Sequence, residues 1–197
     1  MMRRPAILLV ALVFALSLAG CGGTTPPDGS LPCNEGIDVQ RAAGFDPALE
    51  AQIPVAGWAE RPTAVDSGRE CSKARLGPLW GAGIRELRSA GAQFGDGGYS
   101  LVVYSAPGLT LDALAYAFER GARGGRKTQE IRTADETIAA TGWPAFRMTL
   151  INGDHGQVVV LFADPAEAPL VRGLLTSDLS FDEVDRLLAA YAAALTR

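Results

Sequence analysis

The sequence predicts an α+β domain in which helices pack on a single antiparallel sheet. Two observations predict the sheet: residues 101–104 are apolar on both faces, as in a central strand, and several strand candidates lie between residues 127 and 175. A third observation, an amphipathic C-terminal helix with a clear start signal, predicts the helical layer. The 177 residues after position 20 are enough for one such domain.

The region before residue 84 carries the weakest signals. Residues 38–52 are a helical candidate that Gly44 and Pro47 interrupt, and we expect the sheet to begin at residues 57–61. Residues 66–79 are polar and carry no predicted helix or strand.

A β-hairpin is predicted where residues 84–94 and 99–106 flank the glycine-rich segment 95–98. Glycine supplies the positive φ angles that tight hairpin turns demand. A helix follows over residues 110–121, with Thr110 as its N-cap, because leucine, alanine and phenylalanine recur there every three or four residues.

Further strand candidates follow this helix. They are residues 127–132, residues 137–141 leading into 143–151, residues 157–163 and the short segment 170–175. The glycines of residues 152–156 predict a hairpin loop, and Pro144 indicates a strand start, a bulge or an edge. Ser180 and Glu183 fit a capping box at the start of the last helix.

The N-terminus carries the three parts of a secretory signal. Arg3 and Arg4 precede an apolar run over residues 6–19, and small residues follow at a cleavage point. A helix of this length is about 21 Å long, which is short of the roughly 30 Å that a spanning helix must cross. An uncleaved membrane anchor is therefore the weaker alternative.

Residues 18–21 read Leu-Ala-Gly-Cys and resemble the lipobox of bacterial lipoproteins. The resemblance implies cleavage before Cys21 and a diacylglycerol group on its sulfur, so that residues 1–20 are a lipoprotein signal peptide. The alternative is an ordinary signal peptide with an incidental cysteine. Residues 21–32 are rich in Gly, Thr and Pro and are expected to form a flexible tether, which leaves residues 33–197 as the single domain.

The charge of the mature chain excludes one class of partner. Processing removes Arg3 and Arg4, which leaves 16 basic and 22 acidic residues and a net charge of −6. A mildly acidic domain argues against nucleic acid as a partner, because neutralising phosphates requires a basic face. It also argues against tight electrostatic docking of the whole domain onto anionic lipid.

Cys33 and Cys71 are the cysteines that remain after acylation of Cys21. An exported pair in an oxidising compartment usually bridges, so a disulfide is predicted; two free buried thiols are the alternative. A zinc site is not expected, because His155 is the only histidine and two cysteines need further ligands. No cofactor is expected.

A second resemblance concerns the whole domain. The pattern is Gly57-Trp58, the strand at 101–104 leading into the helix from Thr110, the segment 142–147 (Gly-Trp-Pro-Ala-Phe-Arg), the strand at 158–162 and a closing helix. This order is similar to the PsbP/Mog1-type α/β/α sandwich of small lipoproteins. The resemblance covers roughly residues 50–197 and implies a binding or assembly factor without catalysis.

Candidate functional residues are few. His155 is the only imidazole available as a general base, and no serine near it stands in a nucleophile-elbow pattern, so a hydrolase is a weak alternative. The basic cluster Arg120, Arg123, Arg126 and Lys127 is a candidate anion site, or simply a favourable charge at the end of a helix. Trp143, with Trp58 and Trp80, either lines a ligand surface or packs in the core.

These observations predict a non-enzymatic lipoprotein of the cell membrane or outer membrane. Its Cys21 lipid holds it to the bilayer with the domain on the extracytoplasmic side, where it binds an envelope protein or helps to assemble the envelope. The alternative functions are carriage of a lipid or another apolar ligand between sheet and helices, and hydrolysis through His155.

Overall fold

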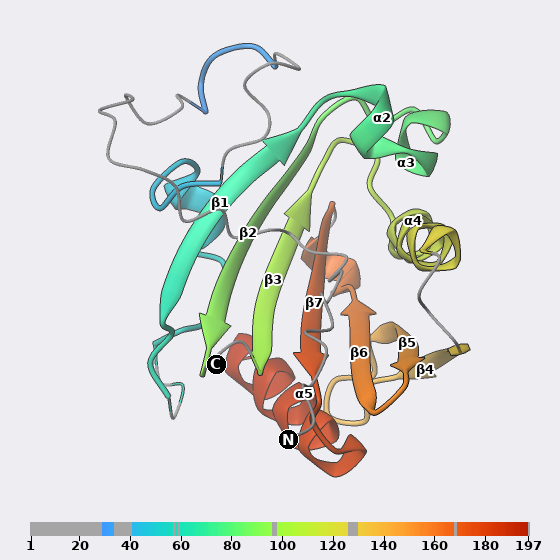
Figure 1. The fold of residues 1–197 in the computed structure, drawn as a ribbon. Coiled ribbons are helices and arrows are strands. Elements are labelled where there is room, and N and C mark those ends of the chain that lie inside the picture. Colours follow the sequence, from blue (N-terminus) through green and yellow to red (C-terminus); the bar gives the residue numbers. More distant parts are fainter. Residues whose placement is uncertain are drawn as a thin grey trace, which may run out of the picture.

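The computed structural model describes one antiparallel sheet and the helices that cover it (Figure 1). The described residues are 29–33, 41–56, 58, 60–95, 98–125, 130–167 and 169–196. The strands are β1 (Ala64–Glu70), β2 (Leu87–Phe94), β3 (Tyr99–Ser105), β4 (Glu130–Thr137), β5 (Pro144–Asn152), β6 (His155–Phe162) and β7 (Leu170–Ser177). Their order across the sheet is β1-β2-β3-β7-β6-β5-β4, so β1 and β4 form the two edges.

Helices cover both faces of this sheet. The helices are α1 (Pro47–Glu50), α2 (Lys73–Leu76), α3 (Pro78–Gly81), α4 (Leu111–Gly124) and α5 (Phe181–Leu195), and a 3-10 turn η1 spans Pro165–Glu167. The short helix α1 and the long helix α5 pack on one face, here called the α5 face. Helices α2, α3 and α4 pack on the other, here called the α4 face.

The α5 face holds the larger of the two cores. Val184, Leu188 and Tyr191 of α5 pack on the inward side chains of the central strands, among them Val160 and Leu174. The capping box predicted at Ser180 and Glu183 is confirmed and fixes where α5 begins. The Tyr191 hydroxyl donates to the Val102 carbonyl at 3.1 Å, and burial raises the pKa of Tyr191 to about 12.

The α4 face is built around Leu114 and Ala115, which pack on Phe146, Met148 and Leu161 of the sheet. Thr110 caps α4 as predicted, its side chain accepting a hydrogen bond from the backbone of Ala113. A close approach occurs at Gly173 in β7, where a Cβ would lie 2.8 Å from a methyl carbon of Val102. The middle of this face is therefore packed too tightly for any side chain at position 173.

The structure confirms the α+β class and the single antiparallel sheet, together with the β2–β3 hairpin and the helix after it. Strands β5, β6 and β7 lie where the segments 143–151, 157–163 and 170–175 predict them, and Pro144 opens an inner strand. Of the candidate at residues 127–132, positions 127–129 lie outside the described residues, and β4 begins at Glu130.

Four predictions about local structure are wrong. The sheet begins at Ala64 rather than at residues 57–61, and residues 66–79 hold most of β1, the whole of α2 and the start of α3. The described part of the candidate helix 38–52 contains only the four-residue α1, because Pro47 starts the helix and the chain turns after Glu50. The predicted strand at residues 137–141 is replaced after Thr137 by a turn over residues 138–142, in which Gly142 takes a φ of 74°.

The predicted tether 21–32 also needs correction at its C-terminal end. Gly29, Leu31 and Pro32 are bound to the sheet through their backbone carbonyls. The prediction of a tether rests on composition alone, and composition does not reveal hydrogen-bond donors that lie 37 to 59 residues away in the sequence. The part at residues 21–28 lies outside the described residues.

Candidate functional site

A shallow groove of about 430 Å³ lies on the α4 face between α4 and the edge strand β4. Asp112, Tyr116 and Glu119 line it from successive turns of α4, with Ala115 below them. Thr133, Ala134 and Asp135 line it from β4, and Phe146 of β5 forms its buried floor. The groove is thus a meeting point of three carboxylates and two aromatic rings.

The position of this groove follows from two local patterns. A spacing of three or four residues places the side chains of Asp112, Tyr116 and Glu119 along one side of α4. The edge strand β4 has no strand beyond it, so Asp135 stays exposed. Tyr116 is 55% exposed at the rim, a high value for an aromatic ring. A ligand in this groove meets negative charge on both walls.

The groove is not predictable from the sequence. Asp112 lies in the first turn of α4, where a negative charge is favourable for any helix. Its position in the sequence therefore does not indicate a binding site. Asp135 carries no signal at all. The two meet only because α4 crosses over the β4–β5 edge of the sheet, a tertiary arrangement with no counterpart in local sequence.

One arginine of the predicted basic cluster, Arg123, already forms an ion pair within α4. Arg123 binds Glu119 one turn earlier on α4, with nitrogen–oxygen distances of 2.6 and 2.8 Å. This ion pair places a cation beside the acidic groove rather than in an anion site of its own. Arg120 is exposed on the same helix, whereas Arg126 and Lys127 lie outside the described residues. The proposed anion site therefore stays a prediction.

His155 begins β6 and pairs with Asp178, whose carboxylate lies 3.0 Å from the ring nitrogen Nδ1. Asp178 has a left-handed φ of 57° and also accepts a hydrogen bond from the backbone of Gly156 at 2.9 Å. The hydrogen bond from His155 and that from Gly156 lower the pKa of Asp178. The pair resembles the acid and base of a catalytic triad, but it is half exposed at the tip of a hairpin.

The imidazole is far from the groove. Phe146 pairs with Leu161, six residues along β6 from His155. At about 3.3 Å per residue, this places the two sites roughly 20 Å apart. Within the described part of the chain, the imidazole hydrogen-bonds to Asp178 and to no serine or threonine. A hydrolase would need a hydroxyl nucleophile at the hairpin tip.

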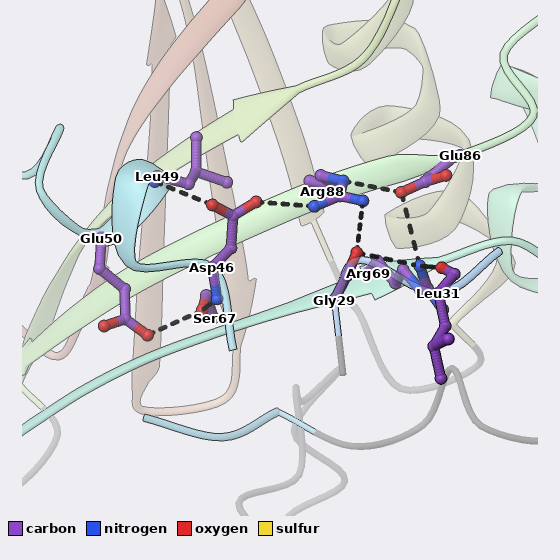
Figure 2. Close-up of polar contacts among 9 residues, drawn as sticks. All are labelled: Gly29, Leu31, Asp46, Leu49, Glu50, Ser67, Arg69, Glu86 and Arg88. Carbon is purple, nitrogen blue, oxygen red and sulfur yellow. Dashed lines mark hydrogen bonds and ion pairs between the residues drawn. The ribbon is translucent and has the colours of Figure 1, made fainter. Parts of the chain in front are cut away.

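A second polar cluster lies on the α5 face over β1 and β2, and Figure 2 shows its members. The buried guanidinium of Arg69 donates to the carbonyls of Leu31 at 2.6 Å and Pro32 at 3.1 Å. The Arg88 guanidinium donates to the carbonyl of Gly29 at 2.9 Å. Two arginines of adjacent strands thus clamp residues 29–33, here called the strap, against the sheet.

Carboxylates hold these arginines in place. Arg88 binds Asp46 at 3.0 Å and Glu86 at 2.7 Å (Figure 2). Burial, the largest single influence, lowers the pKa of Arg88, but the hydrogen bonds and charges of the two carboxylates outweigh it and raise the pKa. Asp46 also caps α1 by accepting from the backbone of Leu49, so one carboxylate serves both the helix and the clamp.

A disulfide joins Cys33 at the end of the strap to Cys71 just after β1, with a Cα–Cα distance of 5.9 Å. Glu86 completes a group whose ligand-type atoms all lie within 4.8 Å of one another. In the disulfide, neither sulfur is a thiolate, and the Glu86 carboxylate is already bound by Arg88. The disulfide in this group therefore joins the strap covalently to the residue that follows β1.

The tryptophans behave mainly as packing residues. Trp143 is half-buried and stacks on Phe162 at a centroid distance of 6.2 Å. Trp58 packs against Phe94 and Tyr191 and donates to the Tyr99 hydroxyl at 2.9 Å. A ligand-binding role for Trp143 is therefore a prediction that its surroundings do not favour.

Cys21, the predicted site of lipidation, lies outside the described residues. Among the residues that the structure describes, no helix is both long enough and apolar enough to cross a membrane.

Comparisons with known proteins assign no family to the chain. No family model matches it, and no solved structure matches it. The tryptophan synthase alpha chains of Mycobacterium leprae strains Br4923 and TN are each 31% identical to it over 143 residues, which are 73% of this chain and 46% of theirs. The chain thus spans about half the length of these curated relatives, and their activity is not transferred to it.

Proposed function

We propose that this chain is an exported lipoprotein, held by lipid on Cys21 to the cell membrane or outer membrane. Its domain faces the extracytoplasmic side and binds a partner without catalysing a reaction. The observation that carries the binding role is the groove between α4 and β4, which joins carboxylates on two walls to a buried aromatic floor. Both the anchor and the partner are part of the proposal.

The disulfide between Cys33 and Cys71 supports export. Disulfides persist in oxidising compartments outside the cytosol and are rare within it. Its position also suits an anchored protein, because it fastens the chain to the domain twelve residues after Cys21. A mechanical force on the Cys21 anchor is then carried by the Cys33–Cys71 disulfide before it acts on β1.

The fold supports a finer assignment, which is also a proposal. Helices on both faces of one antiparallel sheet, with a long C-terminal helix closing one face, agree with the resemblance to PsbP/Mog1-type domains. Domains of that type are mostly binding and assembly factors. This similarity of layout is an analogy, and it supports a binding role alongside the groove.

The chemistry of the groove favours a ligand with positive charge. Asp112 and Asp135 are exposed on opposite walls, and the rings of Tyr116 and Phe146 offer flat surfaces that attract cations. An amine or guanidinium group of a partner protein meets both requirements. An acyl chain would have to lie between carboxylates, so the groove favours the apolar-carrier alternative less.

Titration with two cationic probes, a lysine-rich peptide and an alkyl diamine, tests the groove by NMR. We expect saturable shifts at Tyr116 and Phe146, and their loss in the double variant Asp112→Asn with Asp135→Asn. Asp154→Asn, at the distant β5–β6 hairpin, removes a carboxylate from outside the groove and should leave the shifts unchanged. Equal shifts in all three proteins, or none in the parent, would contradict a groove ligand of this class.

The hydrolase alternative rests on the His155–Asp178 pair. If it is correct, the protein has turnover on esterase or peptidase substrates, and His155→Ala abolishes that turnover. Activity that survives His155→Ala, or no activity at all, removes this alternative.

A further inference from the structure

We propose that the end of the domain that carries the strap, α2 and α3 is a surface that rests on the lipid bilayer. The inference depends on the proposed lipid anchor at Cys21 and adds the orientation of the domain on the membrane. It is carried by two independent observations: where the strap enters the fold, and which side chains surround that entry.

The entry point of the strap is fixed at one end of β1. Arg69 and the Cys33–Cys71 disulfide both hold it beside the last residues of this strand. Gly29 lies so close to Phe45 that a Cβ on it would approach the Phe45 carbonyl oxygen to 2.7 Å. The strap therefore has one fixed position on the domain.

The length of chain between lipid and strap limits how far this end can be from the bilayer. Eight residue steps separate Cys21 from Gly29. At about 3.5 Å per residue, they span at most roughly 28 Å even when fully extended. The domain is thus held close to the membrane by the end at which β1 finishes.

The side chains around this entry suit a bilayer surface, although the domain as a whole is acidic. The helices α2 and α3 lie together beyond the end of β1 (Figure 1). They and their flanks present Lys73, Arg75 and Arg85, of which Arg75 pairs with Glu70. Anionic headgroups attract such clusters of lysine and arginine.

Two apolar side chains accompany this charge. Leu31 in the strap is 52% exposed, so its apolar side chain is accessible at this end of the domain. Trp80 of α3 is half-buried, with the Arg85 guanidinium 4.3 Å above its ring. Tryptophan with a cationic neighbour is typical of the interface between headgroups and water.

The groove and the strap lie toward opposite edges of the sheet. The groove lies at β4, six strand spacings from β1 in the sheet order. At about 4.8 Å per spacing, that is roughly 29 Å across the sheet. The groove is therefore separated laterally, along the plane of the sheet, from the point at which the strap enters the fold.

Energy transfer to the bilayer tests the orientation. The lipidated full chain is reconstituted into phosphatidylglycerol–phosphatidylethanolamine vesicles that contain an acceptor-labelled lipid. A donor dye is attached through Ala82→Cys at the end of α3 or through Asp154→Cys at the β5–β6 hairpin, both of which are exposed. We expect transfer from position 82 to exceed that from position 154 several-fold.

Charge-reversal variants sharpen the test. Lys73→Glu with Arg85→Glu should reduce the difference between the two dye positions, whereas Arg132→Glu on β4 should not. Equal transfer from both positions in a protein whose intact mass includes the lipid would overturn the bilayer surface alone. A protein without acyl mass would instead contradict the anchor, and with it the proposed function.

Discussion

The buried guanidinium of Arg69 donates a 2.6 Å hydrogen bond to the backbone carbonyl of Leu31, which lies 38 residues earlier in the chain. Arg69 is only 5% exposed, and it also donates to the Pro32 carbonyl. The strap is thus held by a charged donor that has little access to water. Such bonds contribute more than neutral ones, and their loss removes the side-chain donor that holds these two carbonyls to the sheet.

Replacement of Arg69 by Leu should therefore be costly. We expect a loss of roughly 2–4 kcal/mol in the free energy of unfolding, measured by urea denaturation, because the strap carbonyls lose their donor. Protease cleavage near residue 29 should rise in parallel. Arg132→Leu, whose side chain is 71% exposed, is the matched control and should change stability by less than about 0.5 kcal/mol. Equal losses in both variants would contradict the clamp.

The disulfide should stabilise the domain through the unfolded state. A bond across 38 residues contributes about 4 kcal/mol in the chain-entropy model. The double variant Cys33→Ser with Cys71→Ser should show that loss in urea denaturation. Adding reductant should destabilise the parent but leave the variant unchanged. A parent that does not respond to reductant would mean that the bond contributes nothing.

Gly173 should not tolerate a side chain. A Cβ there would lie 2.8 Å from one methyl of Val102 and 3.1 Å from one of Leu161. Gly173→Ala should therefore lower the free energy of unfolding by roughly 1–3 kcal/mol. Gly98→Ala is the matched control, since a Cβ at Gly98 meets nothing within 4 Å. A stability loss at Gly98 equal to that at Gly173 would refute the packing argument.

Asp178 should make stability depend on pH in the acid range. Its pKa is lowered in the folded state, first by the hydrogen bond from His155 and then by that from Gly156. Because a depressed carboxyl pKa favours the folded state only when the group is ionised, this contribution is complete above the ordinary aspartate pKa and is lost as pH falls.

Asp178→Asn tests this dependence, since asparagine also tolerates the left-handed φ of 57°. The parent should be slightly more stable than the variant at neutral pH, and the difference should shrink as pH falls below about 4. The effect is small because the pair is half exposed. A difference that stays constant from neutral pH into the acid range would show that the carboxylate charge plays no part.

The long elements could be predicted from sequence because their signals are local. The α5 helix carries its own capping box and apolar stripe, and the β2–β3 hairpin carries its glycine turn. Each of these patterns is complete within about twenty residues. Tertiary contacts then preserve what local preference already favours.

The edge strand β1 could not be predicted because its stabilisation is not local. Its sequence, Ala-Val-Asp-Ser-Gly-Arg-Glu, has a single β-branched residue. The polar side chains find partners far away: Asp66 binds Arg41, and Ser67 hydrogen-bonds to Glu50 and to the backbone of Asp46. No periodic pattern in the sequence predicts such long-range pairs. The groove at β4 could not be predicted for the same reason.

The intact mass of the protein recovered from its host membrane decides whether the chain is a lipid-anchored exported protein. The account predicts an N-terminus at Cys21 with added acyl mass, and a Cys33–Cys71 pair that resists alkylation until it is reduced. A mature chain without acyl mass, or one that retains residues 1–20, would contradict the account.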